Sequence, residues 1–101
     1  MSRRLAVVFV ALLVAGCNLG GPDEDATGEE MYVQLCARCH GADLSGGVGP
    51  PLGPDTNAAL EDDEYLEFTI SNGRGRMPSF ASLDPEQVDR LVAYMREVQG
   101  E

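Results

Sequence analysis

The most regular hydrophobic pattern lies near the end of the chain, where five apolar residues share one face of a potential α-helix. They are Val88, Leu91, Val92, Met95 and Val98. In front of them Asp84 is a favourable N-cap, Pro85 suits the first helical position and Gln87 stands at the third. The pattern predicts a helix that begins after Asp84 and ends before Gly100.

Two further helices are predicted upstream. The first follows a capping box, in which Thr27 is the N-cap and Glu30 is the third helical residue. Its apolar residues at helical spacing are Met31, Tyr32 and Leu35. We expect this helix to run into residues 36–40. A middle helix is predicted at about residues 62–72, because an acidic start suits the positive end of a helix and Gly73 suits its stop.

The stretch between these two helices, residues 41–58, is rich in glycine and proline and is predicted to be a long wrapping loop of functional importance. No strand pattern competes with the helical ones, so the predicted fold class is all-α, with three to four helices. A domain of this size has a marginal core, which a covalently bound apolar cofactor would help to stabilise.

The start of the chain has the composition of a secretory signal. Arg3 and Arg4 precede an apolar run, residues 5–15, which is shorter than the roughly twenty residues that a membrane-spanning helix needs. The run leads into Val-Ala-Gly-Cys, which resembles a bacterial lipoprotein box with cleavage before Cys17 and a lipid on its thiol. Ordinary cleavage that leaves a free Cys17, or a retained short anchor, are the alternatives.

Three parts are therefore expected. Residues 1–16 would be a removed lipoprotein signal peptide, and residues 17–26 a lipidated, flexible tether rich in glycine, proline and acidic residues. Residues 27–101 would be the folded domain. The expected location is extracytoplasmic, on the periplasmic side or in the cell envelope, with attachment to the membrane by the lipid anchor.

The strongest chemical signal is Cys36-Ala37-Arg38-Cys39-His40. A C-x-x-C-H run is typical of covalent haem c attachment, in which each thiol bonds to one vinyl group and the histidine ligates the iron. A thioredoxin-like pair would need a βαβ pattern, and a zinc site would need more ligands, whereas no Cys or His follows His40. We interpret Cys36 and Cys39 as the attachment site of one haem c and His40 as an iron ligand.

A second iron ligand is sought among the methionines, because ferrous iron favours a soft thioether. Met1 leaves with the signal, and Met31 and Met95 lie in the hydrophobic patterns of helices, where a core role is expected. Met77 instead lies in a non-helical, Gly- and Arg-rich stretch whose glycines let the backbone approach a haem closely. Met77 is the predicted ligand, with a gap-filling methionine under a loop as the alternative.

Together, the C-x-x-C-H run, a Met-Pro pair that begins 37 residues after the histidine and the capped C-terminal helix resemble a class I cytochrome c. The resemblance covers residues 27–99. It implies a small helical bundle around one haem, in which the N- and C-terminal helices cross closely. Gly28 and Tyr32 on the first helix, with Leu91 and Tyr94 on the last, match the positions where such helices meet.

The resemblance extends to residues 49–52, Gly-Pro-Pro-Leu, which are similar to the Gly-Pro-x-Leu segment of this family. It implies that the carbonyl of Pro50 accepts the Nδ1 proton of His40, which fixes the tautomer of the imidazole and raises its basicity. It also implies that Leu52 packs on the haem.

Charge bears on the partners. The formal net charge is −10, and loss of the two signal arginines leaves five arginines against seventeen acidic residues, or −12. This acidity argues against nucleic acid and favours redox partner proteins with basic or largely apolar docking surfaces. Arg74 and Arg76 are candidates to pair with haem propionates, since guanidinium groups match carboxylate geometry; exposure on a solvated turn is the alternative.

The expected function is that of a one-electron carrier of a bacterial extracytoplasmic electron-transport chain, not that of an enzyme. With His40 and Met77 on opposite faces of the iron, no coordination position would be open to a small-molecule substrate. Two alternatives stand beside it: a haem-bearing subunit of a larger oxidoreductase or oxidase complex, and a ligand-binding haem protein in which Met77 is labile.

Overall fold

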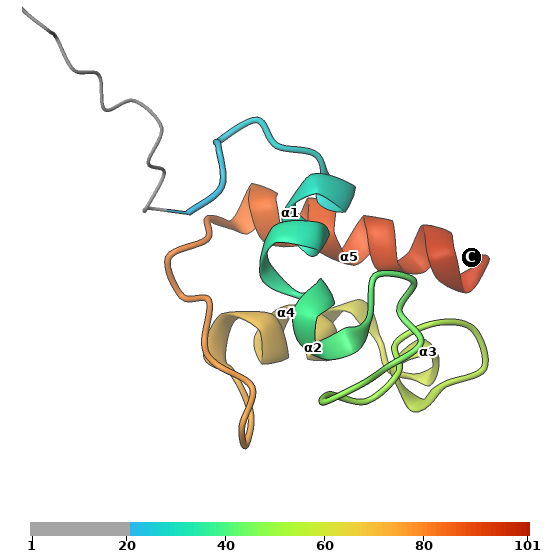
Figure 1. Ribbon diagram of the computed structural model, residues 1–101. Coiled ribbons are helices and arrows are strands. Elements are labelled where there is room, and N and C mark those ends of the chain that lie inside the picture. Colours follow the sequence, from blue (N-terminus) through green and yellow to red (C-terminus); the bar gives the residue numbers. More distant parts are fainter. Residues whose placement is uncertain (1–20) are drawn as a thin grey trace, which may run out of the picture.

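The structure is a computed structural model that describes residues 21–101. The described part of the chain folds into helices joined by loops. Its only β-structure is one isolated bridge, between Arg74 and Met77. The helices are α1 (Gly28–Leu35), α2 (Ala37–His40), α3 (Asn57–Leu60), α4 (Asp63–Asn72) and α5 (Pro85–Gln99). The predicted all-α class is confirmed, and α2 and α3 are single turns added to three longer helices (Figure 1).

Helix α5 is the longest element, and both α1 and α4 pack against it (Figure 1). Its N-cap Asp84 accepts a hydrogen bond from the backbone N–H of Gln87 at 2.9 Å, and the Gln87 side chain accepts one from the N–H of Asp84 at 2.8 Å. At the other end Gly100 adopts a left-handed conformation, with φ of 89°. Both predicted ends of this helix are confirmed.

The close crossing of α1 and α5 is also confirmed. A Cβ atom added to Gly28 would overlap the carbonyl oxygen of Arg90 and lie 2.9 Å from the Cβ of Tyr94. One turn further along, the rings of Tyr32 and Tyr94 are 5.6 Å apart between centroids, at an interplanar angle of 49°. The backbones of the two helices therefore touch where glycine removes the side chain.

Helix α4 matches its predicted range. Its N-cap Asp62 accepts a hydrogen bond from the backbone N–H of Tyr65 at 2.9 Å, and Gly73 ends the helix with a positive φ of 76°. Apolar side chains of α1, α4 and α5, together with residues of the adjoining loops, form one core. Its buried members are Ala26, Met31, Tyr32, Leu44, Leu66, Ile70, Val88, Leu91, Val92 and Met95.

Three predicted boundaries differ from the structure. The first helix does not run unbroken through residues 36–40, because the backbone turns at Cys36, which caps both α1 and α2. The loop is irregular only over residues 41–56, since α3 occupies the positions that follow. A single helical turn is too short to show hydrophobic periodicity, so the sequence did not predict α3.

The third difference concerns the tether. Residues 23–26 are held against α5, where the guanidinium of Arg90 donates to the carbonyls of Glu24 and Ala26 at 2.8 and 3.1 Å. Ala26 is itself buried. The folded domain therefore begins earlier than residue 27.

The proposed signal and Cys17 lie outside the described residues. Within residues 21–101, none of the helices combines the length and the apolar character that a membrane span requires.

Candidate haem-binding site

One helical turn carries the three residues of the C-x-x-C-H motif that bear chemistry. Cys36 caps α2, and the backbone N–H groups of Cys39 and His40 both donate to its carbonyl, at 3.1 and 3.0 Å. Residues three and four positions apart lie on the same side of a helix. The two thiols and the imidazole therefore project from one side of α2.

Both cysteines are half-buried, and neither forms a disulfide within residues 21–101. The pKa of the Cys36 thiol is raised from 9.0 to about 11; burial is the main cause, and the neighbouring Cys39 is the second. A thiol with so high a pKa is protonated at neutral pH. The buried position of Cys36 thus favours the neutral thiol over a reactive thiolate.

His40 is buried, with 8% of its surface exposed, and its Nδ1 lies 2.7 Å from the carbonyl oxygen of Pro50. A carbonyl oxygen can only accept a hydrogen bond, so the proton of the neutral imidazole sits on Nδ1. The lone pair is then on Nε2, the nitrogen that can ligate a metal. The hydrogen bond implied by the Gly-Pro-x-Leu segment is present.

The loop that supplies Pro50 packs directly on the imidazole. A Cβ atom added to Gly49 would lie 2.9 Å from Cε1 and 3.0 Å from Nδ1 of His40, so a larger residue would displace the ring. The N–H of Gly49 also donates to the carbonyl of Cys39 at 2.7 Å. The ring is therefore held both by its own hydrogen bond and by backbone packed against it.

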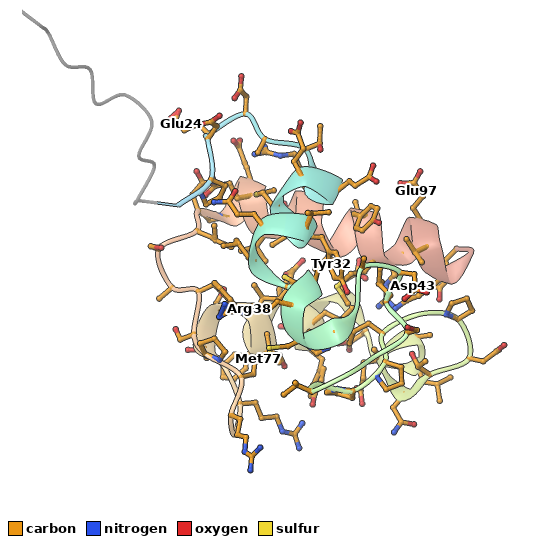
Figure 2. The ribbon with its side chains drawn as sticks, in the orientation of Figure 1. Glu24, Tyr32, Arg38, Asp43, Met77 and Glu97 are labelled. Atoms are coloured by element: carbon orange, nitrogen blue, oxygen red, sulfur yellow. The ribbon has the colours of Figure 1, made fainter. Side chains whose placement is uncertain are left out.

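Met77 lies in a tight hairpin after α4, in the Gly- and Arg-rich stretch that the sequence singled out. Its N–H and carbonyl exchange hydrogen bonds with the backbone of Arg74, at 2.9 and 3.1 Å. Gly75 at the tip adopts a positive φ of 59°. The side chain of Met77 is half-buried against the core, and Figure 2 shows it on the same side of the domain as Arg38 of α2.

The two arginines of this hairpin differ in their contacts. Arg74 donates a hydrogen bond to the hydroxyl of Tyr65 on α4, while Arg76 makes no hydrogen bond or ion pair with any of residues 21–101. Both side chains are exposed. Leu52, expected to pack on the haem, is half-buried beside the core.

Two hydrogen bonds near the site were not expected from the sequence. The hydroxyl of Tyr32 donates to the carbonyl of Gly41 at 2.6 Å, directly after His40, and Gln99 donates to the carbonyl of Leu52 at 2.7 Å. Tyr32 was expected only at the helix crossing, and Gln99 lies 59 positions beyond His40. No motif joins such distant residues, so only the folded chain reveals these contacts.

The donor set fits a covalently attached haem. Two free thiols lie three residues apart, one imidazole has its lone pair on Nε2, and a half-buried thioether is available in a tight hairpin. An imidazole and a thioether form the ligand pair found in cytochromes c. Cys36, Cys39, His40 and Met77 are the residues that would hold the group.

Comparison with known proteins agrees with this donor set. The family described as cytochrome c oxidase, cbb3-type, subunit III matches residues 23–95. Cytochrome c-551 of Bacillus subtilis is 33% identical over 113 aligned residues, covering 96% of this chain and 98% of its own. Cytochrome c55X of Paracoccus denitrificans is 35% identical and covers 97% of this chain and 98% of its own.

Solved structures and larger proteins contain the same domain. Cytochrome cL of Hyphomicrobium denitrificans superposes with a TM-score of 0.64 at 34% identity, over 71% of this chain and 45% of that one. A dihydro-haem d1 dehydrogenase of Pseudomonas aeruginosa is 38% identical, but this chain spans only 18% of it. The matching family, the small relatives that align end to end and the shared fold show that this chain belongs to the cytochrome c family, as a small haem c protein that transfers electrons.

Proposed function

We propose that this cytochrome c is a one-electron carrier that binds haem through Cys36 and Cys39 and ligates its iron with His40 and Met77. The observation that carries the proposal is the imidazole of His40, which stands on the same helical turn as both thiols with its Nδ1 2.7 Å from the Pro50 carbonyl. Haem supplies a reversible ferrous–ferric couple when bound. The residues of the chain would keep the haem and its ligands in the same arrangement in both oxidation states.

The ligands have distinct tasks in this proposal. The Pro50 carbonyl keeps the proton of His40 on Nδ1, which orients the ring and raises its basicity toward iron. The thioether of Met77 favours the ferrous state and raises the reduction potential. Because both ligands stay bound in both oxidation states, the site would take up no substrate. Leu52 would cover the haem face, and Arg74 and Arg76 would pair with its propionates.

Visible spectroscopy and carbon monoxide binding test this proposal on the holoprotein. We expect the oxidised protein to show the weak long-wavelength band that arises from a sulfur ligand on ferric iron. We also expect the reduced protein to leave carbon monoxide unbound. If the band is missing and carbon monoxide binds readily, Met77 is labile and the protein is a ligand-binding haem protein instead.

We further propose that the protein works on the extracytoplasmic side of a bacterial membrane, held there by a lipid on Cys17. The support is the Val-Ala-Gly-Cys sequence that follows an apolar run of signal length. Several acyl chains on one cysteine give stable anchoring, whereas one chain binds only marginally. The folded domain would stay close to the membrane, since a short tether joins Cys17 to residue 23.

Its partners are redox proteins, for which we propose docking surfaces that are basic or largely apolar. The excess of acidic residues supports this choice, because complementary charge accelerates encounter.

A second candidate function is that of a haem-bearing subunit of a larger complex. The subunit CcoP of a cbb3-type cytochrome c oxidase from Rubrivivax gelatinosus is 33% identical over 78% of this chain, which spans 27% of that protein. Solubilisation of membranes in mild detergent followed by size separation distinguishes the two. A carrier migrates at the size of the single chain, and a subunit co-migrates with its complex.

A further inference from the structure

Gln99, the last residue of α5, connects that helix to the loop of the haem site. Only 8% of its surface is exposed, and both ends of its amide have partners. Its Nε2 donates to the carbonyl of Leu52 at 2.7 Å, and its Oε1 accepts from Nη1 of Arg96 at 2.8 Å. A buried amide with both ends bonded has a defined orientation.

Arg96 fixes the far side of that amide. Its Nε forms an ion pair with Asp63 at 2.8 Å, and its Nη2 donates to the carbonyl of Glu61 at 2.5 Å. The guanidinium is therefore held by Glu61 and by the first residue of α4 as well as by its own helix. Gln99 thus reaches Leu52 from a fixed support and not from a frayed helix end.

Leu52 is in turn tied to the backbone that orients His40. Its N–H donates to the carbonyl of Leu44 at 2.8 Å, so hydrogen bonds hold both sides of this residue. Two residues earlier, Pro50 presents its carbonyl to the imidazole. Proline rings restrict φ at Pro50 and Pro51, and a following proline also restricts ψ of Pro50. The stiff segment therefore transmits the position of Leu52 to the Pro50 carbonyl.

We propose that Gln99 is a positioning residue for His40: by holding Leu52, it keeps the Pro50 carbonyl in line with Nδ1–H of the imidazole. This inference rests on the proposed role of His40 as a haem ligand. A firm hydrogen bond at Nδ1 makes the imidazole a stronger donor and favours the ferric state. Loss of the Gln99 contact therefore weakens that bond and shifts the reduction potential upward.

The test compares the holoprotein with Gln99→Leu and Gln99→Glu. Leucine removes both amide contacts, whereas glutamate keeps an acceptor for Arg96 and loses the donor to Leu52. Arg90→Leu is the matched control, because Arg90 lies on the same helix but clamps residues 24–26. NMR of the reduced protein measures hydrogen exchange of His40 Nδ1–H relative to the backbone N–H of Val92, which lies in the buried core.

The ratio of the two exchange rates separates local loosening from lower global stability, which accelerates exchange at both sites. We expect the ratio to rise by about tenfold or more in both Gln99 variants, which corresponds to the loss of one hydrogen bond. The reduction potential should rise with it. Arg90→Leu should change the ratio by less than about twofold even where stability falls.

An unchanged ratio and potential in Gln99→Leu overturns the inference, and so does a Gln99→Glu variant that behaves like the unsubstituted protein. Failure of the proposed function is recognised separately. In that case the unsubstituted protein lacks the sulfur-to-iron band, whatever the exchange ratios of the variants.

Discussion

His40 illustrates how much of the site depends on single backbone carbonyls. The Pro50 carbonyl holds its ring at Nδ1, and the Tyr32 hydroxyl holds the carbonyl of Gly41, the next residue in the chain. Leu44, in the same loop, is fully buried with a positive φ of 65°. The ligand is therefore embedded in backbone that has few alternative positions.

Replacement of the proposed thioether ligand separates it from a core methionine. We expect Met77→Ala to abolish the long-wavelength sulfur-to-iron band and to let carbon monoxide bind the reduced haem. Met95 is buried in the core on α5, so Met95→Ala should lower stability by about 2–5 kcal/mol and keep the band. Visible spectra of the two oxidised variants check this, and loss of the band in Met95→Ala alone would reverse the assignment.

Because the phenol of Tyr32 ionises, the stability of the folded protein should depend on pH in the alkaline range. Burial is the main cause that raises its pKa from 10.0 to about 12. Because the unfolded state loses this proton first, the stabilisation is complete below pH 10.0 and is lost as pH rises toward about 12.

Tyr32→Phe should remove this part of the pH dependence and lower stability at neutral pH by about 1–3 kcal/mol, since the Gly41 carbonyl loses its partner. Urea unfolding of both holoproteins between pH 8 and about 12 measures the difference. Equal slopes above pH 10.0 would contradict the assignment to Tyr32.

At the scale of helices, the domain is organised by what packs on α5. Its N-terminal half meets α1 at Gly28 and holds residues 24–26 through Arg90. Its C-terminal end holds the loop of the site and the segment before α4 through Gln99 and Arg96. One helix therefore contacts residues 24–26, close to the start of the described part of the chain, and reaches the proposed haem site.

At the close crossing of α1 and α5, one added methyl group should strongly lower the stability of the fold. In Gly28→Ala the new Cβ would overlap the backbone of Arg90, which cannot move as a side chain can. We expect a loss of about 3 kcal/mol or more in the free energy of unfolding. Gly21→Ala is the control, because nothing lies within 4 Å of its added Cβ. Urea unfolding of the holoproteins measures both, and similar midpoints would refute the close crossing.

At the scale of the molecule, the five arginines within residues 21–101 divide into two groups. Arg90 and Arg96 are committed to contacts within the fold, whereas Arg38, Arg74 and Arg76 are exposed. Each of the exposed three lies within three residues of a proposed haem-binding residue, either a cysteine of the motif or Met77. In the part of the chain that the structure describes, the exposed arginines of this acidic protein therefore lie beside the proposed haem site.

The proposed anchor is tested on the complete chain. Cys17→Ser should move the haem-bearing protein from the membrane fraction to the soluble periplasmic or culture fraction, because no acyl chains remain to be buried. Haem staining of the separated fractions measures this. The visible spectrum should stay unchanged, since Cys17 has no role in the haem site. Retention of Cys17→Ser on the membrane would disprove the lipid anchor.

Local chemistry and periodicity in the sequence determined the all-α class, the caps of three helices and the haem motif. Each of these depends on residues within a few positions of one another, such as Asp84 with Gln87 or Cys36 with His40. The role of Pro50 came from the resemblance to a family, because the residues around Pro50 by themselves predict only a proline-rich turn. Met77 could be singled out because its neighbours exclude a helix.

Only the tertiary structure decided how distant parts meet. The break at Cys36, the single turn α3 and the docking of residues 23–26 each depend on packing or on hydrogen bonds that leave no periodic trace. The same holds for Gln99 and Leu52, whose contact spans 47 positions. Such contacts form because a small domain must satisfy its buried polar groups with whatever the folded chain brings near, and sequence order does not specify those partners.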